Sequence, residues 1–331
     1  MYFIKLTVSI CVVAFLICGG CSGSDVEGPP EGNINYRQEM RDFVTDIGNY
    51  ARGVNGSFII VPQNGQELVT DTGEGDGTPV SAYLNSIDAT GREGLFYGYG
   101  DDDQPTPAED LQHMLDLCLV CEQYGVEVLT TDYCFTHSKM DDSYSQNQQN
   151  EFISFAADHR DLDNIPDYPA QPHNANSDDI SDISQAKNFL YLINGENYGT
   201  KQEFIDAVSA TNYDVIIMDL CFNEVMFTEA EVQQLKAKQN GGSRLVICYM
   251  SIGEAEDYRF YWQSSWNSNK PEWLGAENPE WAGNYKVRYW YPEWQAIIFG
   301  SSDSYLDRIL NAGFDGVYLD IIDAFDYYEN L

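Results

Sequence analysis

Apolar and β-branched residues gather in eight short runs along the chain, and each run is followed by polar or charged side chains. Most of the runs are continuous rather than alternating, which is typical of parallel strands buried on both faces. Helical patterns lie between most of them, with start signals at Thr106–Pro107 and at Thr228, and residues 292–313 form one further helical pattern. The pattern therefore predicts strands that alternate with helices. The predicted strands cover residues 57–64, 86–97, 126–133, 151–160, 188–195, 213–220, 243–257 and 314–323.

Eight strands alternating with helices predict one α/β domain, a (β/α)8 TIM barrel. A doubly wound sheet is the alternative, but no Gly-rich phosphate loop follows any predicted strand. A strong helical pattern at 35–53 precedes the first strand, and only a short segment follows the last one. We expect that helix to fill the gap where the barrel closes. Residues 163–185 form a Pro-, Asn-, Ser- and Asp-rich connector that is unusually long for a compact barrel. It indicates a circular permutation, with the connector crossing an older pair of termini.

The N-terminal residues form a separate segment. Lys5 precedes an apolar run at 6–18, which is too short to span a bilayer and has the length of a signal sequence. Small residues then lead to Cys21, and a polar, Pro/Gly-rich stretch follows. We expect a lipoprotein signal at 1–21 with Cys21 lipidated, a flexible tether at 22–34 and the barrel at 35–331. A plain secretory signal and a retained membrane anchor are the alternatives. The protein would then be secreted or held at the cell surface by its lipid.

The formal net charge is −36, which argues against nucleic acid as a partner because phosphate binding needs a basic surface. The acidity fits either a solvated surface or attraction of a cationic substrate. Cys118 and Cys121 form a CxxC pair, but they lie on the apolar face of a predicted helix, so we expect them to pack in the core. The four histidines are scattered. The sequence therefore predicts no metal site and no cofactor.

Polar residues end every predicted strand, and barrel active sites lie at the carboxyl ends of the strands. Together these strand-end residues would form an acidic concave surface at one end of the barrel, here called the bowl. Such a surface suits a divalent cation, which prefers oxygen ligands, or glycoside hydrolysis by two carboxyl groups. All six tryptophans lie between 262 and 294, where they could stack on sugars or form a cluster of their own. Their presence beside the bowl favours a sugar. The strand-end residues are Gln63, Asn64, Glu93, Asp132, Asp158, Arg160, Asn194, Asp219, Glu254, Glu256, Asp257, Asp320 and Asp323.

Three long motifs resemble the extracellular glycosidases of glycoside hydrolase family 114, which are related to endo-α-1,4-polygalactosaminidases. They are "CYMSIGEAEDYRFYW" (248–262), "NPEWAGNYKVRYWYPEWQAII" (278–298) and "YLDRILNAGFDGVYLDIIDAFDYY" (305–328). The segments "IIVPQNGQELV" (59–69) and "SIDATGREGLFY" (86–97) are also similar to that family, where they follow the "GVYLDIID" strand instead of preceding it. The resemblance thus covers nearly the whole mature chain in permuted order.

The resemblance implies a (β/α)8 barrel with two essential carboxylates, which match Asp320 and Glu93. We expect Asp320 to act as nucleophile or base and Glu93 as general acid. The implied substrate and partner is an α-linked amino-sugar polysaccharide similar to polygalactosamine. A non-catalytic carbohydrate-binding barrel and a calcium-bound surface protein are the alternatives. The expected substrate contacts are Asn64, Asp132, Asp219, Glu254, Asp257, Tyr258, Arg259 and Asp323, of which Asp323 could equally hold its own loop.

Overall fold

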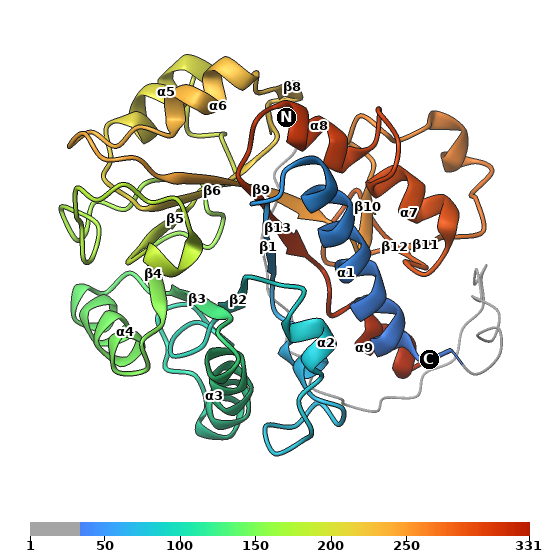
Figure 1. The fold of residues 1–331 in the computed structure, drawn as a ribbon, viewed down its shortest axis with the longest axis horizontal. Helices are drawn as coiled ribbons and strands as arrows, with labels where there is room; N and C mark the ends of the chain where they lie inside the picture. Colours follow the sequence, from blue (N-terminus) through green and yellow to red (C-terminus); the bar gives the residue numbers. More distant parts are fainter. Residues whose placement is uncertain (1–33) are drawn as a thin grey trace.

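The computed structural model describes residues 34–331, in which parallel strands alternate with helices around a common core (Figure 1). The predicted signal at 1–21, Cys21 and almost all of the tether lie outside the described residues. Across residues 34–331, no helix is both long and apolar enough to cross a membrane. All eight predicted strands form, each shorter than its apolar run. They are β1 (Ile59–Pro62), β2 (Ala89–Glu93), β3 (Glu127–Tyr133), β4 (Ile153–Ala157), β5 (Phe189–Tyr191), β6 (Val215–Asp219), β9 (Leu245–Ser251) and β13 (Gly316–Asp320).

The strands follow one another in chain order around the core. Parallel pairing joins β1, β13, β9, β6 and β5 in one sheet and β2, β3 and β4 in another. A parallel bridge between Gln63 and Gly91 links β1 to β2. Between β4 and β5, the rings of Phe155 and Phe189 lie 5.7 Å apart, and no strand pairing joins these two strands in the described part of the chain. This mainly parallel arrangement is compatible with the predicted (β/α)8 barrel.

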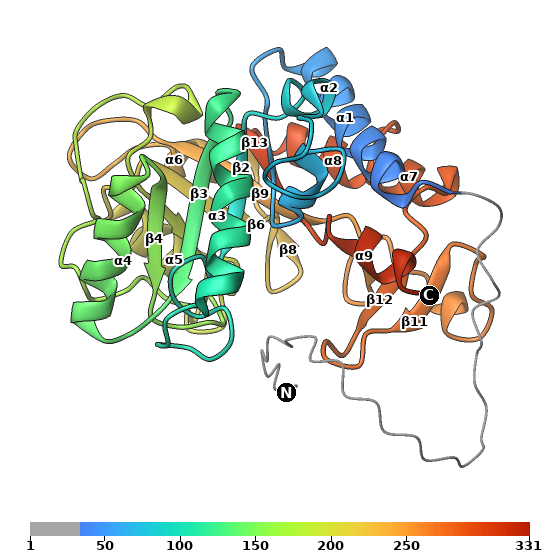
Figure 2. The same ribbon diagram turned by 90° about the horizontal axis from the view of Figure 1, so that it is seen from below.

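Helix α1 packs against the C-terminal helices α8 and α9 (Figures 1 and 2). The hydroxyl of Tyr50 in α1 donates to Asp307 Oδ1 in α8 at 3.0 Å. Helix α1 therefore lies beside β1 and beside the helices on either side of β13. The helices are α1 (Tyr36–Val54), α2 (Ser81–Leu84), α3 (Ala108–Gln123), α4 (His137–Gln149), α5 (Lys201–Ser209), α6 (Glu229–Leu235), α7 (Pro292–Ile298), α8 (Tyr305–Asn311) and α9 (Ala324–Glu329), with 3₁₀ turns at η1 (Gln66–Val69), η2 (Ile183–Gln185) and η3 (Ser264–Asn267).

Two local predictions about helices were wrong. Pro107, not Thr106, is the N-cap of α3, and the Thr106 hydroxyl instead donates to Gly94 O at 2.8 Å, which ties down the loop after β2. The pattern at 292–313 predicted one helix, but the chain breaks it into α7 and α8, with Gly300 at φ +96° between them. The cap at Thr228 is confirmed, because its side chain accepts from the N–H of Glu231.

The long segment after β9 folds on itself. It contains β10 (Glu254–Glu256), β11 (Leu274–Glu277) and β12 (Asn284–Val287), which form an antiparallel sheet in the order β10-β12-β11, and this sheet lies beside α9 (Figure 2). Trp266, Trp273 and Trp294 are buried there, with successive rings 5.0 and 5.1 Å apart. These three tryptophans thus form part of the apolar core of this segment. A separate hairpin of β7 (Cys221–Phe222) and β8 (Val225–Met226) follows β6.

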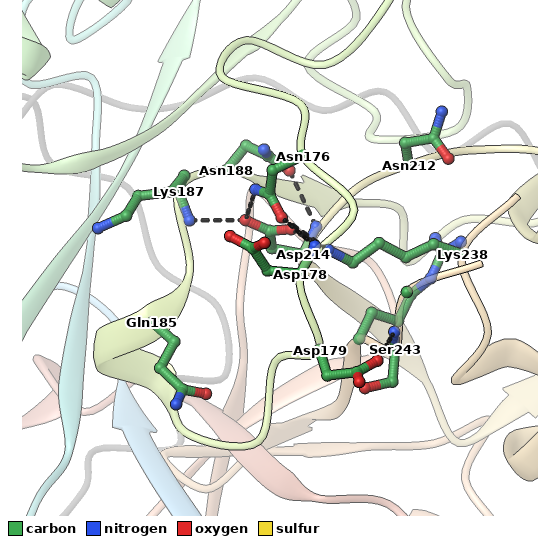
Figure 3. Close-up of polar contacts among 12 residues, drawn as sticks. Asn176, Asp178, Asp179, Gln185, Lys187, Asn188, Asn212, Asp214, Lys238 and Ser243 are labelled. Atoms are coloured by element: carbon green, nitrogen blue, oxygen red, sulfur yellow. Dashed lines mark hydrogen bonds and ion pairs between the residues drawn. The ribbon is translucent and has the colours of Figure 1, made fainter. Parts of the chain in front are cut away.

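The connector at 163–185 is fixed to the amino ends of the strands (Figure 3). Lys238 Nζ lies 2.6 Å from Asp214 Oδ1, and both side chains have 0% exposure. Asn176 of the connector bridges them, since its Nδ2 donates to Asp214 at 2.9 Å and its Oδ1 accepts from Lys238 at 3.0 Å. These contacts therefore hold the connector against the residues that precede β6.

Candidate active site

Two carboxyl groups lie at the carboxyl ends of parallel strands. Asp320 is the last residue of β13, and Glu93 is the last residue of β2. Strand β1 lies between these two strands, because it pairs with β13 and is bridged to β2. The two backbones are therefore about two strand spacings, or about 10 Å, apart. Side chains of this length can turn towards one another across that gap.

Glu93 is held as a hydrogen-bond acceptor. Its Oε1 accepts from the Tyr133 hydroxyl, and its Oε2 accepts from Asn64 Nδ2 at 3.1 Å. A second hydrogen bond joins the same two residues, because Asn64 Oδ1 accepts from the Glu93 N–H at 3.1 Å. Asn64 itself has φ +58°, a left-handed conformation that asparagine tolerates better than most residues. These hydrogen bonds fix the position of the Glu93 carboxyl group.

Two hydrogen bonds also fix the carboxyl group of Asp320. Its Oδ2 accepts from the Tyr249 hydroxyl at 2.5 Å and its Oδ1 from the Ile321 N–H at 2.8 Å. Ile321 has φ +59°, which is rare for a β-branched residue. Such backbone strain gathers at functional sites. Burial and the nearby charge of Glu93 raise the pKa of Asp320 to about 8. The carboxyl group therefore carries a proton near neutral pH.

Tyrosines form the floor beneath the two carboxyl groups. Tyr191 and Tyr318 are buried with ring centroids 5.1 Å apart. The Tyr318 hydroxyl is buried and has no hydrogen-bond partner among the described residues. It lies so close to Gly91 that a Cβ there would come within 1.9 Å of it. Burial, then the charges of Glu93 and Asp320, raise the pKa of Tyr318. The floor is thus built of buried aromatic rings with protonated hydroxyls, and electrostatic interactions above it are strong.

Arg259 joins two strand-end carboxylates beside this pair. Its guanidinium donates to Asp219 at 2.8 Å and to Glu256 at 2.6 Å, and only 8% of its side chain is exposed. The Tyr258 hydroxyl also donates to Glu256, at 2.6 Å. Burial acts to lower the pKa of Arg259, but Asp219 and Glu256 outweigh it and raise the pKa. Asp219 is therefore paired within the protein, in a cluster of one guanidinium and two carboxylates.

Asp132 does not face the bowl, contrary to the prediction. Its carboxylate has 0% exposure and points to α4 and the loop after β2. It accepts from the backbone of Phe96 at 2.9 Å and of Tyr97 at 3.1 Å, and from Ser143 Oγ at 2.6 Å and Asn147 Nδ2 at 3.2 Å. With these partners it fixes the loop that follows Glu93 and cannot reach a substrate.

The remaining acidic candidates differ in exposure. Glu254 is buried and accepts from Asn278 Nδ2 at 2.8 Å, so it ties β10 to the segment before β12, and burial raises its pKa. Asp257 is exposed, and its backbone N–H donates to Gly283 O. Asp323 is also exposed; it is the N-cap of α9 but makes no side-chain cap. Asp257 and Asp323 are therefore the residues of this group that are open to solvent.

Sequence reasoning missed the two tyrosines that hold the catalytic candidates. Tyr133 and Tyr249 lie inside strands β3 and β9, where they were counted among the apolar residues. A buried tyrosine hydroxyl normally needs a partner, and that rule was the available signal. In the part of the chain that the structure describes, no group of three or more His, Cys, Asp or Glu side chains is arranged to hold a metal ion.

Comparison with known proteins supports the same class of chemistry. The model of glycoside-hydrolase family GH114 matches residues 169–331, about half of the chain, which includes Asp320 but not Glu93. This match supports a GH114-family glycoside hydrolase.

Three uncharacterized proteins are similar to the chain over part of their length. The chain is 41% identical to one from Methanocaldococcus jannaschii over 54% of its own length and 49% of the relative. It is 44% identical to one from Thermotoga maritima over 37% of its length and 36% of the relative. It is 39% identical to one from Deinococcus radiodurans over 40% of each chain. The chain thus matches no more than about half the length of these relatives.

Proposed function

We propose that this protein is a glycoside hydrolase in which Asp320 and Glu93 cleave an α-linked amino-sugar polysaccharide. One observation carries the proposal: the two carboxyl groups end strands on either side of β1, and burial together with the charge of Glu93 raises the pKa of Asp320. Glycoside hydrolysis needs such a pair, with one group protonated and the other ionised. The family match over the half of the chain that holds Asp320 supports the same class.

In this proposal Asp320 is the proton donor and Glu93 is the ionised partner. Asp320 has its pKa raised to about 8 and so has a proton to give to the glycosidic oxygen. Glu93 accepts from Tyr133 and Asn64, and it either attacks the anomeric carbon or takes a proton from the attacking water. The sequence had suggested the opposite order of roles. We exchange the two roles because burial and the charge of Glu93 favour the protonated form of Asp320.

An amino-sugar polymer is the substrate that best fits the charge. The net charge of −36 attracts a polycation. The exposed carboxylates of Asp257 and Asp323 could bind ammonium groups, and Asn64 could bind a sugar hydroxyl. The exposed ring of Tyr258 is fixed by the hydrogen bond of its hydroxyl to Glu256 and offers a flat face to a sugar.

The proposal also includes a permuted chain order and a location at the cell surface. The family match begins at residue 169, inside the connector at 163–185 that was expected to cross older termini. Helix α1 meanwhile packs beside α8 and α9, so the two ends of the barrel domain adjoin. A lipid on Cys21 would hold this domain outside the cell.

The test is incubation of the full chain with partly deacetylated polygalactosamine, and with neutral and other amino-sugar polymers. New oligosaccharides from polygalactosamine, released less rapidly as salt is added, would support both the activity and the electrostatic attraction. Binding without any product from any polymer would indicate a carbohydrate-binding barrel instead. Products from neutral polymers alone would refute the proposed substrate class.

A further inference from the structure

The hydroxyl of Tyr249 is directed at Asp320 from the neighbouring strand. Strand β9 pairs with β13 in parallel register, with Tyr249 opposite Tyr318 and Ser251 opposite Asp320. Tyr249 thus lies two residues before the level of the carboxyl group and reaches forward to it. Its hydroxyl donates to Asp320 Oδ2 at 2.5 Å. The tyrosine side chain is buried, so the packing of the floor fixes where this hydroxyl lies.

We propose that Tyr249 is a positioning residue, whose hydroxyl holds the Asp320 carboxyl for proton transfer and stabilises its ionised form. The inference rests on the proposed function for the role of Asp320. With Oδ1 occupied by the Ile321 N–H and Oδ2 by Tyr249, the carboxyl group cannot turn about its side-chain bonds without losing both contacts. A proton donor must be fixed in this way to lie within hydrogen-bond reach of the glycosidic oxygen.

The hydrogen bond also opposes the forces that keep Asp320 protonated. Burial and the Glu93 charge favour the neutral carboxyl, whereas the donors Tyr249 and Ile321 favour the ionised one. After the proton has left, the same hydroxyl stabilises the carboxylate that remains. Removal of the hydroxyl should therefore raise the pKa of Asp320 by about one to two units. The titratable groups that face Asp320 and Tyr249 are Glu93, Tyr191, Glu256, Tyr258, Tyr318 and Asp323.

The experiment is an NMR titration of the side-chain carboxyl carbons in the full chain, with Asp320→Asn used to assign the Asp320 signal. In Tyr249→Phe the Asp320 midpoint should move up by about one to two pH units. The matched control is Tyr318→Phe, which removes a neighbouring hydroxyl that has no hydrogen-bond partner. In that variant the midpoint should stay close to that of the parent protein. A folded Tyr249→Phe protein whose Asp320 midpoint is unchanged or lower would overturn the inference.

A second variant decides the matter if Tyr249→Phe does not fold. Replacement of Tyr249 by 3-fluorotyrosine keeps the shape and makes the hydroxyl a stronger donor, so the Asp320 midpoint should move down. A midpoint that stays put or moves up would overturn the inference. In an active protein, the basic limb of kcat/KM should shift with the same sign and size as the NMR midpoint. Because the titration needs no substrate, it can succeed or fail independently of whether any polysaccharide is cleaved.

Discussion

The ion pair of Lys238 and Asp214 gives the sharpest stability prediction. The two charged atoms lie 2.6 Å apart with both side chains at 0% exposure. Lys238→Ala leaves the Asp214 carboxylate buried with two remaining donors, Asn176 Nδ2 at 2.9 Å and the Lys187 N–H at 2.8 Å. Removal of one member of a buried pair costs about 3–5 kcal/mol. The two remaining donors place the expected loss of unfolding free energy near the lower end of this range.

Equilibrium unfolding in urea measures the loss, and Lys201→Ala is the matched control. Lys201 pairs with Glu231 at 2.9 Å, but the two side chains keep 20% and 27% exposure. A pair that water still reaches is worth about 0–1 kcal/mol. The reasoning would be refuted if Lys238→Ala cost no more than Lys201→Ala. Replacing Lys238 by Met together with Asp214 by Leu should recover much of the loss, because no buried charge then remains.

Two further predictions concern the site. The raised pKa of Asp320 means that the folded state loses stability as pH rises from about 4 through about 8. Asp320→Asn removes that loss, so its gain in unfolding free energy over the parent, measured in urea, should be larger at pH 8 than at pH 5, by up to about 1.4 kcal/mol per pH unit; an equal or smaller gain at pH 8 would contradict the assigned pKa. Gly91→Ala would place a Cβ 1.9 Å from the Tyr318 hydroxyl, so it should cost about 1–3 kcal/mol by overpacking and lower hydrolysis by displacing β2. In Gly56→Ala the added Cβ would have no other atom within 4 Å, so the unfolding free energy and the rate of hydrolysis should stay unchanged. Equal effects at the two positions would refute the overpacking argument.

The sequence was sufficient for the strands and for the acids that end β2, β6 and β13, but the predicted strand at 243–257 ends at Ser251 as β9, and Glu254–Glu256 forms the separate strand β10. Continuous apolar runs mark buried parallel strands wherever they occur, so Asp320 and Glu93 could be placed at strand ends without knowing the packing. The direction of a side chain at a strand end is harder to predict, because successive residues point to opposite faces. Asp132 and Tyr133 show this: the predicted Asp132 points outward to α4, while Tyr133 points inward and donates to Glu93.

Contacts between distant segments were beyond prediction for a related reason. The bond from Tyr249 to Asp320 depends on the register between β9 and β13, which are 71 residues apart at this contact. The pairing of Arg259 with Asp219 likewise joins residues 40 positions apart. The local pattern of apolar and polar residues determines neither the register of the strands nor the packing that sets these distances. The sequence therefore identified the acidic rim but not which acids are neutralised within it.

Initial rates of hydrolysis by Glu93→Gln and Asp320→Asn test the central claim most directly. The substrate is partly deacetylated polygalactosamine, and the readout is kcat/KM for newly formed reducing ends. Loss of a proton-transferring group lowers rates by about 10²–10⁴, so each variant should fall at least that far while its circular dichroism stays native. Glu109→Gln, an exposed carboxylate on α3, should keep the parent rate. A folded Glu93→Gln or Asp320→Asn protein with the parent rate would contradict the account.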